Sequence, residues 1–271
     1  EMFDIVSDLH IDQWDKTIEL KYPCGEVKHA PYIPMIPQNE ILIVVGDVSD
    51  SLQNTLIYLN DISIYYKKIL FVDGNHEHVN AYPNLYTQKE INEEVKKLNN
   101  NKIVYLPCNP YQIGKTLVIG ACGWWDYNNS DQASINSSME YFKEWIPEFG
   151  QKENQKFIDN VTERSREECQ QLQKILEFTN KDDFIENIVI VTHCVPKNKF
   201  ASKNQEKTIV NNGFERLLKN KELSKKISHW MFGHIHHNIG CQENGIRFIC
   251  HPRGRPEDYN REMYDFFSSK L

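Results

Sequence analysis

Residues 41–47 read ILIVVGD and residues 69–76 read ILFVDGNH. Each segment begins with at least four consecutive apolar residues and ends in glycine and polar side chains. An unbroken apolar run of this length is typical of a strand that is buried on both faces. The same order recurs at Met2–Val6 before Asp8, Leu117–Ala121 before Gly123, Ile188–Thr192 before His193 and Trp230–Phe232 before His234. The sequence therefore predicts buried strands that present polar groups at their C-terminal ends.

Helical patterns separate these strands. Leu52–Tyr66, Gln88–Leu98 and Gln155–Phe178 are each long enough for a helix, and the last carries an apolar stripe at helical spacing. Strands that alternate with helices indicate crossover connections and a mostly parallel sheet. Near the end of the chain, Asn244-Gly245 between two short apolar runs predicts an antiparallel hairpin over Ile239–Ile249.

Two stretches are predicted to be insertions, because they lack a regular apolar pattern. They are Gln13–Gln38, with its four prolines, and Trp124–Gly150, with its Asn and Ser runs. Both follow strand ends that carry polar residues, so both are candidate substrate loops. The chain has no internal repeat, linker or low-complexity tract, and we therefore expect a single domain over residues 1–271.

The charge of the chain limits the choice of partner. The 271 residues include 31 Lys and Arg against 38 Asp and Glu, a formal charge of -7. No basic block that would follow a phosphate backbone is visible, so nucleic acid is disfavoured as a partner. A metal site can itself hold phosphate, and the charge therefore does not exclude a small anionic substrate.

The cysteines and the hydropathy of the chain indicate a compartment. The seven cysteines are scattered and form no Cys-x-x-Cys pair, as expected for reduced thiols in a cytosol. No segment is long and apolar enough to span a bilayer, and the first residues lack the regions of a signal peptide. We therefore expect a cytoplasmic protein without a membrane partner, whereas the oligomeric state cannot be predicted from these features.

The polar residues at the strand ends are of the types that bind transition metals. Hydrolysis of a phosphate ester at neutral pH requires an activated water and positive charge at the phosphoryl oxygens, and two cations about 3.5–4 Å apart supply both. Such a pair requires carboxylate, imidazole and amide donors from several strands. The chain offers them in Asp8-Leu9-His10, Gly46-Asp47, Gly74-Asn75-His76-Glu77, His193 and Gly233-His234-Ile235-His236.

The arrangement of these blocks carries more information than any one of them. Alternation along an extended segment should turn Asp8 and His10 to one side, and likewise His234 and His236. A single Asp-x-His or strand-end histidine is more often a helix cap or a packed side chain than a metal ligand. Five blocks that all follow a strand in the same way indicate one site.

In their order along the chain these blocks resemble the calcineurin-like metallophosphoesterase superfamily, whose pattern is D-x-H, G-D, G-N-H-E/D, a strand-end H and G-H-x-H. The match extends over residues 8–236. The resemblance implies an α/β fold of the metallo-dependent phosphatase type, a four-layer αββα sandwich with two central mixed β-sheets. It implies that one metal ion is bound by Asp8, His10, Asp47 and His236, and a second by Asp47, Asn75, His193 and His234, with Asp47 as the bridge.

The same resemblance makes His76 the catalytic histidine, which stabilises or protonates the leaving oxygen. Asp50 falls where the protein-phosphatase branch, with its G-D-x-x-D-R-G block, keeps a carboxylate that pairs with this histidine. The alternative is that Asp50 caps the helix that begins near Leu52. The expected reaction is in-line attack by a metal-bridging hydroxide on phosphorus. The mixed ligands suit manganese, iron, zinc or nickel better than magnesium, and we favour manganese or iron.

The chain departs from the protein-phosphatase pattern in one block. Asp50 is followed by Ser51-Leu52 and not by Arg-Gly, which disfavours protein substrates. The segment Cys250–Gly254 instead resembles the Asn-Pro-Arg-Gly ending of a bacterial and phage-type branch, with His251 in place of the asparagine.

Candidate substrate-binding residues lie outside the metal-ligand blocks. Arg253 or Arg255 could bind substrate phosphate, although an arginine that holds a closing turn is the commoner case. Trp124 and Trp125 are candidates for an aromatic platform under a nucleobase, although aromatic residues of long loops more often pack against the domain.

We therefore expect a hydrolase of a small phosphodiester or phosphomonoester, with the diester preferred because this branch resembles phosphodiesterases more than protein phosphatases. One alternative is a nuclease that acts on DNA or RNA, against which the acidic charge counts. Another is a non-catalytic, metal-dependent binding or scaffold protein. The presence of His76 beside a full ligand set disfavours this reading, since binding alone requires no acid.

Overall fold

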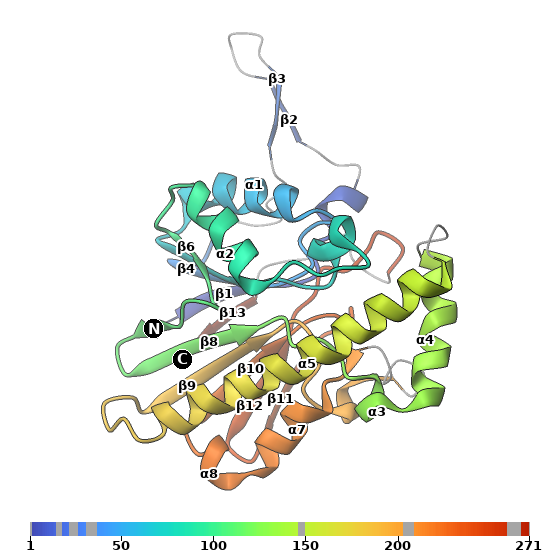
Figure 1. The fold of residues 1–271 in the computed structure, drawn as a ribbon. Coiled ribbons are helices and arrows are strands. Elements are labelled where there is room, and N and C mark those ends of the chain that lie inside the picture. The colour runs from blue at the N-terminus through green and yellow to red at the C-terminus, as the bar shows by residue number, and fades with distance from the viewer. Residues whose placement is uncertain are drawn as a thin grey trace.

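The structure is a computed structural model that describes residues 2–14, 18–21, 27–30, 37–145, 150–202, 209–258 and 267–270. Two β-sheets form its centre, and helices cover them from outside (Figure 1). The first sheet contains, in spatial order, β13 (Phe267–Lys270), β1 (Met2–Val6), β4 (Ile41–Val45), β5 (Lys68–Val72) and β6 (Ile103–Tyr105). The second contains β11 (Ile239–Glu243), β12 (Ile246–Cys250), β10 (Ile227–Phe232), β9 (Asn187–Thr192), β8 (Thr116–Ala121) and β7 (Tyr111–Ile113).

Both sheets are mixed, with a parallel centre and antiparallel edges. Strands β1, β4, β5 and β6 run parallel to one another, and β13 pairs antiparallel with β1. In the second sheet β8, β9, β10 and β12 are parallel, whereas β7 and β11 are antiparallel edge strands. Because parallel strands end at the same edge of a sheet, each sheet collects the loops that follow its central strands on one side.

The four layers follow from apolar residues on both faces of each strand. In β4, Leu42 and Val44 belong to a core cluster with residues of α1 (Leu52–Ile62) and α2 (Gln88–Lys97). Ile43 and Val45 face the other way and pack with residues of β8, β9 and β10 between the two sheets. A third cluster joins the far face of the second sheet to α5 (Gln151–Thr179), α7 (Asn212–Lys219) and α8 (Lys221–Ser224). The predicted αββα sandwich is confirmed.

The predicted elements are present with shifted bounds. The helix expected over Leu52–Tyr66 ends at Ile62 and continues as the 3-10 helix η2 (Ser63–Tyr65), and α5 begins at Gln151, before the predicted start. The hairpin is formed by β11 and β12, with φ of 50° at Asn244 and 83° at Gly245, as its Asn-Gly turn requires. The remaining 3-10 helices are η1 (Ile11–Gln13), η3 (His76–Ala81) and η4 (Asn198–Phe200).

The two predicted insertions contain regular structure. Gln13–Gln38 holds the antiparallel ribbon of β2 (Ile18–Lys21) and β3 (Val27–Ala30), and the segments between and around these strands lie partly outside the described residues. Trp124–Gly150 holds α3 (Tyr127–Ser130) and α4 (Gln132–Trp145), with residues 146–149 outside the description. Their role as substrate loops stays a prediction. Among the described helices, none combines the length and apolar character that crossing a membrane would require.

Candidate metal centre

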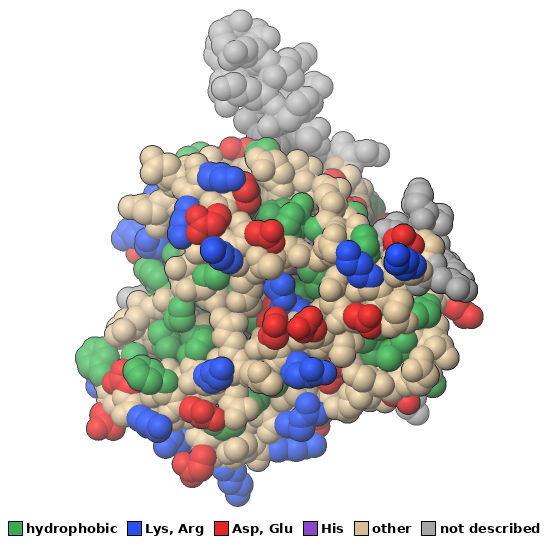
Figure 2. Space-filling view, viewed as in Figure 1, with side chains coloured by type: hydrophobic (Ala, Val, Ile, Leu, Met, Phe, Trp, Pro, Cys, Tyr) green, Lys and Arg blue, Asp and Glu red, His purple; other side chains and the backbone are tan. Residues whose placement is uncertain are grey.

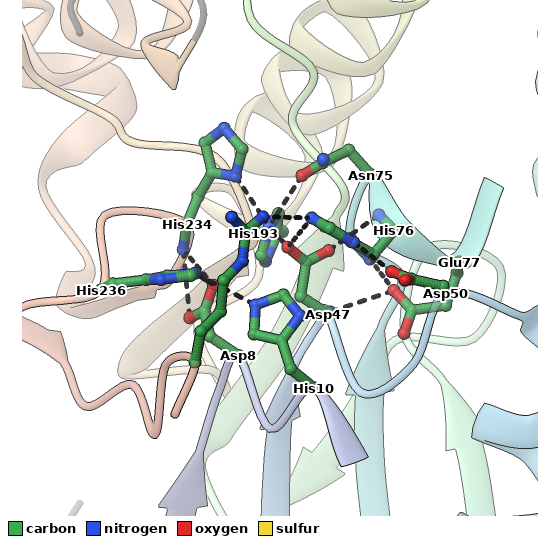
Figure 3. Close-up of polar contacts among 12 residues, drawn as sticks. Asp8, His10, Asp47, Asp50, Asn75, His76, Glu77, His193, His234 and His236 are labelled. Atoms are coloured by element: carbon green, nitrogen blue, oxygen red, sulfur yellow. Dashed lines mark hydrogen bonds and ion pairs between the residues drawn. The ribbon is translucent and has the colours of Figure 1, made fainter. Parts of the chain in front are cut away.

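The candidate ligands follow β1, β4 and β5 of the first sheet and β9 and β10 of the second, and Figure 3 shows their side chains pointing toward a common region. Many of them have a left-handed backbone: φ is 49° at Asp8, 42° at His10, 54° at Asp47, 71° at His234 and 50° at His236. Positive φ is uncommon outside glycine and persists only where the surrounding structure imposes it, most often at functional sites. The backbone strain therefore falls on residues that the sequence selects as ligands.

The expectation that Asp8 and His10 lie on an extended segment is wrong. Strand β1 ends at Val6, and both residues adopt the left-handed conformation beyond it. Leu9 between them is buried in the core cluster of the first sheet, so the flanking side chains turn toward the site. The second histidine pair leaves β10 in the same manner.

Two glycines provide the space in which the ligands crowd together. Gly46 has a φ of 78°, and a Cβ there would lie 2.7 Å from Nδ1 of His193. A Cβ on Gly74 would overlap Oδ1 of Asp47. Any side chain at either position would displace a candidate ligand.

The first group of ligand atoms belongs to Asp8, His10 and His236. Nε2 of His10 lies 3.1 Å from Nε2 of His236, which lies 3.5 Å from Oδ1 of Asp8. Nδ1 of His236 is 2.8 Å from Oδ2 of Asp258. Neutral His236 therefore carries its proton on Nδ1 and turns the lone pair of Nε2 toward the other two ligands, as a metal-binding histidine does.

The second group belongs to Asp47, His193 and His234, and Asn75 adjoins it. Nε2 of His193 lies 3.1 Å from Oδ2 of Asp47 and 3.2 Å from both Oδ1 of Asn75 and Nδ1 of His234. Nδ1 of His193 donates a hydrogen bond to the carbonyl oxygen of Val45 at 2.8 Å. A neutral His193 therefore has a lone pair on Nε2 that faces three other acceptor atoms. A cation would satisfy all four atoms at once, so the donor set fits a metal ion.

The charges of the site keep these atoms in metal-binding forms. Burial and the charge of His76 lower the pKa of His10 to about 3, so its imidazole is neutral. Burial alone would raise the pKa of Asp8, but the neighbouring histidines lower it to about 2, so the carboxylate is ionised. Burial also opposes protonation of His193, yet the Asp47 carboxylate raises the pKa of His193 well above its ordinary value. That carboxylate attracts positive charge to Nε2, whether a proton or a metal ion carries it.

His76 lies beside both groups and pairs with Asp50. Nδ1 of His76 contacts Oδ1 of Asp50, its backbone N donates to Oδ1 of Asp47 at 2.9 Å, and its Nε2 is 3.7 Å from Oδ2 of Asp47. Helix α1 is capped by Ser51, whose side chain accepts the N–H of Asn54. The alternative that Asp50 caps this helix is therefore wrong, and its carboxylate contacts the imidazole instead.

Glu77 is a buried carboxylate to which the sequence analysis assigned no role. Its oxygens accept hydrogen bonds from the backbone N–H groups of Asp47, Val48, Ser49 and Gly74 and from the hydroxyl of Thr55, at 2.6–3.3 Å. The residue thus fixes the loop that carries Asp47 against the loop that carries Asn75. Its place in the G-N-H-E block was the one available signal.

Three candidate substrate-binding residues have packing roles in the structure. The indole rings of Trp124 and Trp125 are 0% and 2% exposed, and Trp125 stacks on His234 with a centroid distance of 5.7 Å. Trp125 thus supports a candidate metal ligand from behind, Trp124 packs against His78 and Trp125, and the packed alternative holds for both tryptophans. Arg253 is buried, donates to the carbonyl oxygen of Leu9 at 3.4 Å and lies over the ring of Trp14. It holds the turn that closes the chain around the site.

The order and spacing of these blocks match a known family. A family model described as calcineurin-like phosphoesterase matches residues 2–238. The chain belongs to this family. This phosphoesterase is therefore a hydrolase with a metal site. Of three histidine and carboxylate groups among the described residues, the two described above are the candidates for that site, and the third consists of His10 with the His76–Asp50 pair.

Similar proteins support the same fold. The phosphoesterase is 23% identical to the uncharacterized protein L509 of Acanthamoeba polyphaga mimivirus over 94% of this chain and 91% of the viral protein. Its structure is similar to that of the phosphopantetheinyl hydrolase PptH of Mycobacterium tuberculosis, with a TM-score of 0.64, 15% identity and coverage of 99% and 95% of the two chains. A dimetal phosphatase from Danio rerio is similar with a TM-score of 0.55, 12% identity and coverage of 100% and 92%.

Proposed function

We propose that this phosphoesterase holds two metal ions and hydrolyses a small phosphodiester or, less efficiently, a phosphomonoester. The observation that carries the proposal is the pair of ligand groups, Asp8–His10–His236 and Asp47–His193–His234, next to the His76–Asp50 pair. Asp47 would bridge the ions, and Asn75 would complete the second group. The donor set favours manganese or iron over an all-oxygen magnesium site.

The residues of this chain would divide the reaction between them. The two ligand groups would hold ions that, when bound, would supply positive charge for the phosphoryl oxygens and lower the pKa of the attacking water. His76 would donate the proton of Nε2 to the leaving oxygen, since Asp50 fixes its Nδ1. Burial alone lowers the pKa of His76, but Asp47 and Asp50 outweigh it and raise that pKa above its ordinary value. Both carboxylates thus favour the protonated imidazole that a proton donor requires.

The names of the structural relatives agree with phosphate-ester chemistry, because one is a phosphopantetheinyl hydrolase and the other a dimetal phosphatase. At sequence identities of 15% and 12%, these relatives show the fold alone. An experiment must therefore decide between a diester and a monoester substrate. The test is a screen of bis-p-nitrophenyl phosphate against p-nitrophenyl phosphate with manganese present, together with elemental analysis of the unheated protein. Two metal ions per chain and faster turnover of the diester are expected.

Variants connect the activity to this site. Asp47→Asn and His76→Ala should each abolish turnover while the protein remains folded by circular dichroism. His237→Asn is the matched control, because His237 is exposed, lies next to a candidate ligand and, within the described part of the chain, forms a side-chain hydrogen bond only with the carbonyl oxygen of Ile235. Full activity in both active-site variants would exclude the proposed mechanism.

A nuclease remains the second candidate. On the face seen in Figure 2, Lys and Arg side chains are interspersed with Asp and Glu and form no continuous basic stripe. Strong nucleic-acid binding usually requires such a stripe. Cleavage of single-stranded DNA with manganese, faster than cleavage of bis-p-nitrophenyl phosphate, would favour the nuclease.

A further inference from the structure

The loop after β12, residues 251–258, brings two arginines to the metal centre, and their environments differ. Arg253 is 2% exposed and makes contacts that hold the turn. Arg255 instead extends to the catalytic histidine, where its Nη2 lies 3.5 Å from Nε2 of His76. This nitrogen of His76 is the one that Asp50 leaves available, because the Asp50 carboxylate contacts Nδ1.

The guanidinium of Arg255 lacks a carboxylate partner among the described residues. No described Asp or Glu forms an ion pair with it, and Asp258 accepts a hydrogen bond from its backbone N–H at 2.7 Å. Its Nε is buried and donates no hydrogen bond within the described part of the chain. A guanidinium is always charged and has five donors, so a buried N–H without an acceptor, beside an Nη2 that faces the imidazole of His76, is unfavourable unless an anion accepts from it.

The backbone around Arg255 is anchored on both sides of the site. The N–H groups of Arg253 and Gly254 donate to the carbonyl oxygens of Ser7 and Asp8, at 2.9 and 2.8 Å. Oδ2 of Asp258 joins the backbone N–H of Arg255 to Nδ1 of His236. The start of the arginine side chain is thereby fixed relative to a metal ligand, and little ordering is left for the moment of binding.

We propose that Arg255 binds a non-bridging oxygen of the substrate phosphate, at the side of the metal centre where His76 lies. The assignment rests on the proposed phosphoesterase function. Arg255 would contact the phosphoryl group directly with its charged N–H donors and would keep the leaving oxygen near Nε2 of His76. Inorganic phosphate, the product of monoester hydrolysis, has the same oxygens and should bind the same side chain.

The test compares Arg255→Gln and Arg255→Lys with the wild type. Arg255→Gln should lower kcat/KM for bis-p-nitrophenyl phosphate on the order of 100-fold, near the upper end for one lost hydrogen bond to a charged group, mainly through a higher KM. It should also weaken binding of inorganic phosphate to the manganese-loaded protein at least about 10-fold in calorimetry. Arg255→Lys keeps the charge without the planar guanidinium, so its kcat/KM and phosphate affinity should lie between those of the wild type and of Arg255→Gln.

Controls separate anion binding from other effects. Metal content should be unchanged in both variants, because Arg255 donates and does not ligate. Arg247→Gln is the matched control, since Arg247 is exposed on β12 shortly before the loop and should leave KM and phosphate affinity unchanged.

The outcomes distinguish this assignment from the proposed function. Wild-type KM and phosphate affinity in folded Arg255→Gln would overturn the role of Arg255 and leave the phosphoesterase intact. If the wild type hydrolyses neither ester, the proposed function fails, and phosphate calorimetry alone then supports or overturns the anion site. Should Arg255→Gln fail to fold, unchanged KM and phosphate affinity in Arg255→Lys would overturn the assignment, because the planar fork would then contribute nothing.

Discussion

Asp50 and His76 are 26 residues apart in sequence, and the Asp50 carboxylate contacts Nδ1 of the buried imidazole. The contact fixes the ring and raises the pKa of His76. We expect Asp50→Asn to lower kcat about 10- to 100-fold, as is usual for a residue that orients a functional histidine. Because the lost charge lowers the pKa of His76, the alkaline limb of the kcat profile should move to lower pH.

A double variant checks this coupling. Once His76→Ala has removed the imidazole, Asp50→Asn should cost little further activity, since both residues act through one proton. A loss in the double variant equal to the product of the two single losses would contradict the pairing.

Glu77 joins the two ligand loops, and its replacement should destabilise the protein. Glu77→Gln puts an NH2 group against backbone N–H donors, such as those of Asp47 and Gly74, that now bond to the carboxylate. A buried donor without an acceptor and the loss of a charged acceptor together should lower the free energy of unfolding by about 3 kcal/mol. Urea unfolding with EDTA present measures this without a contribution from bound metal. Exposed Glu93→Gln is the control and should unfold like the wild type.

That the candidate ligands lie together could be predicted from the sequence, because each one follows an apolar run that is recognisable locally; that they bind metal stays a prediction. Strand ends are encoded within about ten residues, and all of the predicted ligands except Asn75 enter the groups found in the structure. Asn75 joins through its contact with His193. The residue types alone then define the chemistry of the site.

Contacts between distant segments were not predictable in the same way. Arg255 is 179 residues from His76, and no local pattern brings them together. The left-handed backbone at Asp8 depends on hydrogen bonds with Gly46 and Gly254, which only the complete fold supplies. Packing of Trp125 against the domain was the commoner of the two cases considered, but its partner Phe157 of α5 is 32 residues away and no local pattern identifies it.

Asp258 supports the candidate metal ligand His236, and its loss should weaken metal binding. Its Oδ2 contacts Nδ1 of His236 at 2.8 Å, which orients the imidazole and increases the basicity of Nε2. Asp258→Asn should reduce the affinity for one of two metal ions about 10- to 100-fold, the usual effect of a partner of a metal-bound histidine. Manganese titration by calorimetry measures this, and exposed Glu257→Gln is the adjacent control. Identical titrations of the two variants would show that the contact does not affect the metal.

Glu168 should make the stability of the protein depend on pH in the neutral range. Burial, followed by the charge of Asp73, raises the pKa of this carboxyl from 4.5 to about 7. Between these values the folded protein keeps a proton that the unfolded chain releases, so stability decreases as pH rises through this window. The glutamine of Glu168→Gln stays neutral. The decrease in the free energy of unfolding between pH 4 and 8 should therefore be smaller in this variant, by roughly 3 kcal/mol.

Urea unfolding at several pH values with EDTA present compares wild type, Glu168→Gln and the exposed control Glu167→Gln. EDTA removes the pH dependence of metal binding. The difference between the plots of unfolding free energy against pH for the wild type and Glu168→Gln then gives the contribution of the Glu168 carboxyl. Oε2 of Glu168 accepts the backbone N–H of Gly123 at 2.7 Å, and a glutamine oxygen can replace it, so the variant should fold. Parallel curves for wild type and Glu168→Gln would mean that Glu168 is ionised in the folded protein at pH 5 as in the unfolded chain. The N–H groups of Gly123 and Trp124 would then be held by a full negative charge, in place of the largely protonated carboxyl that its burial predicts.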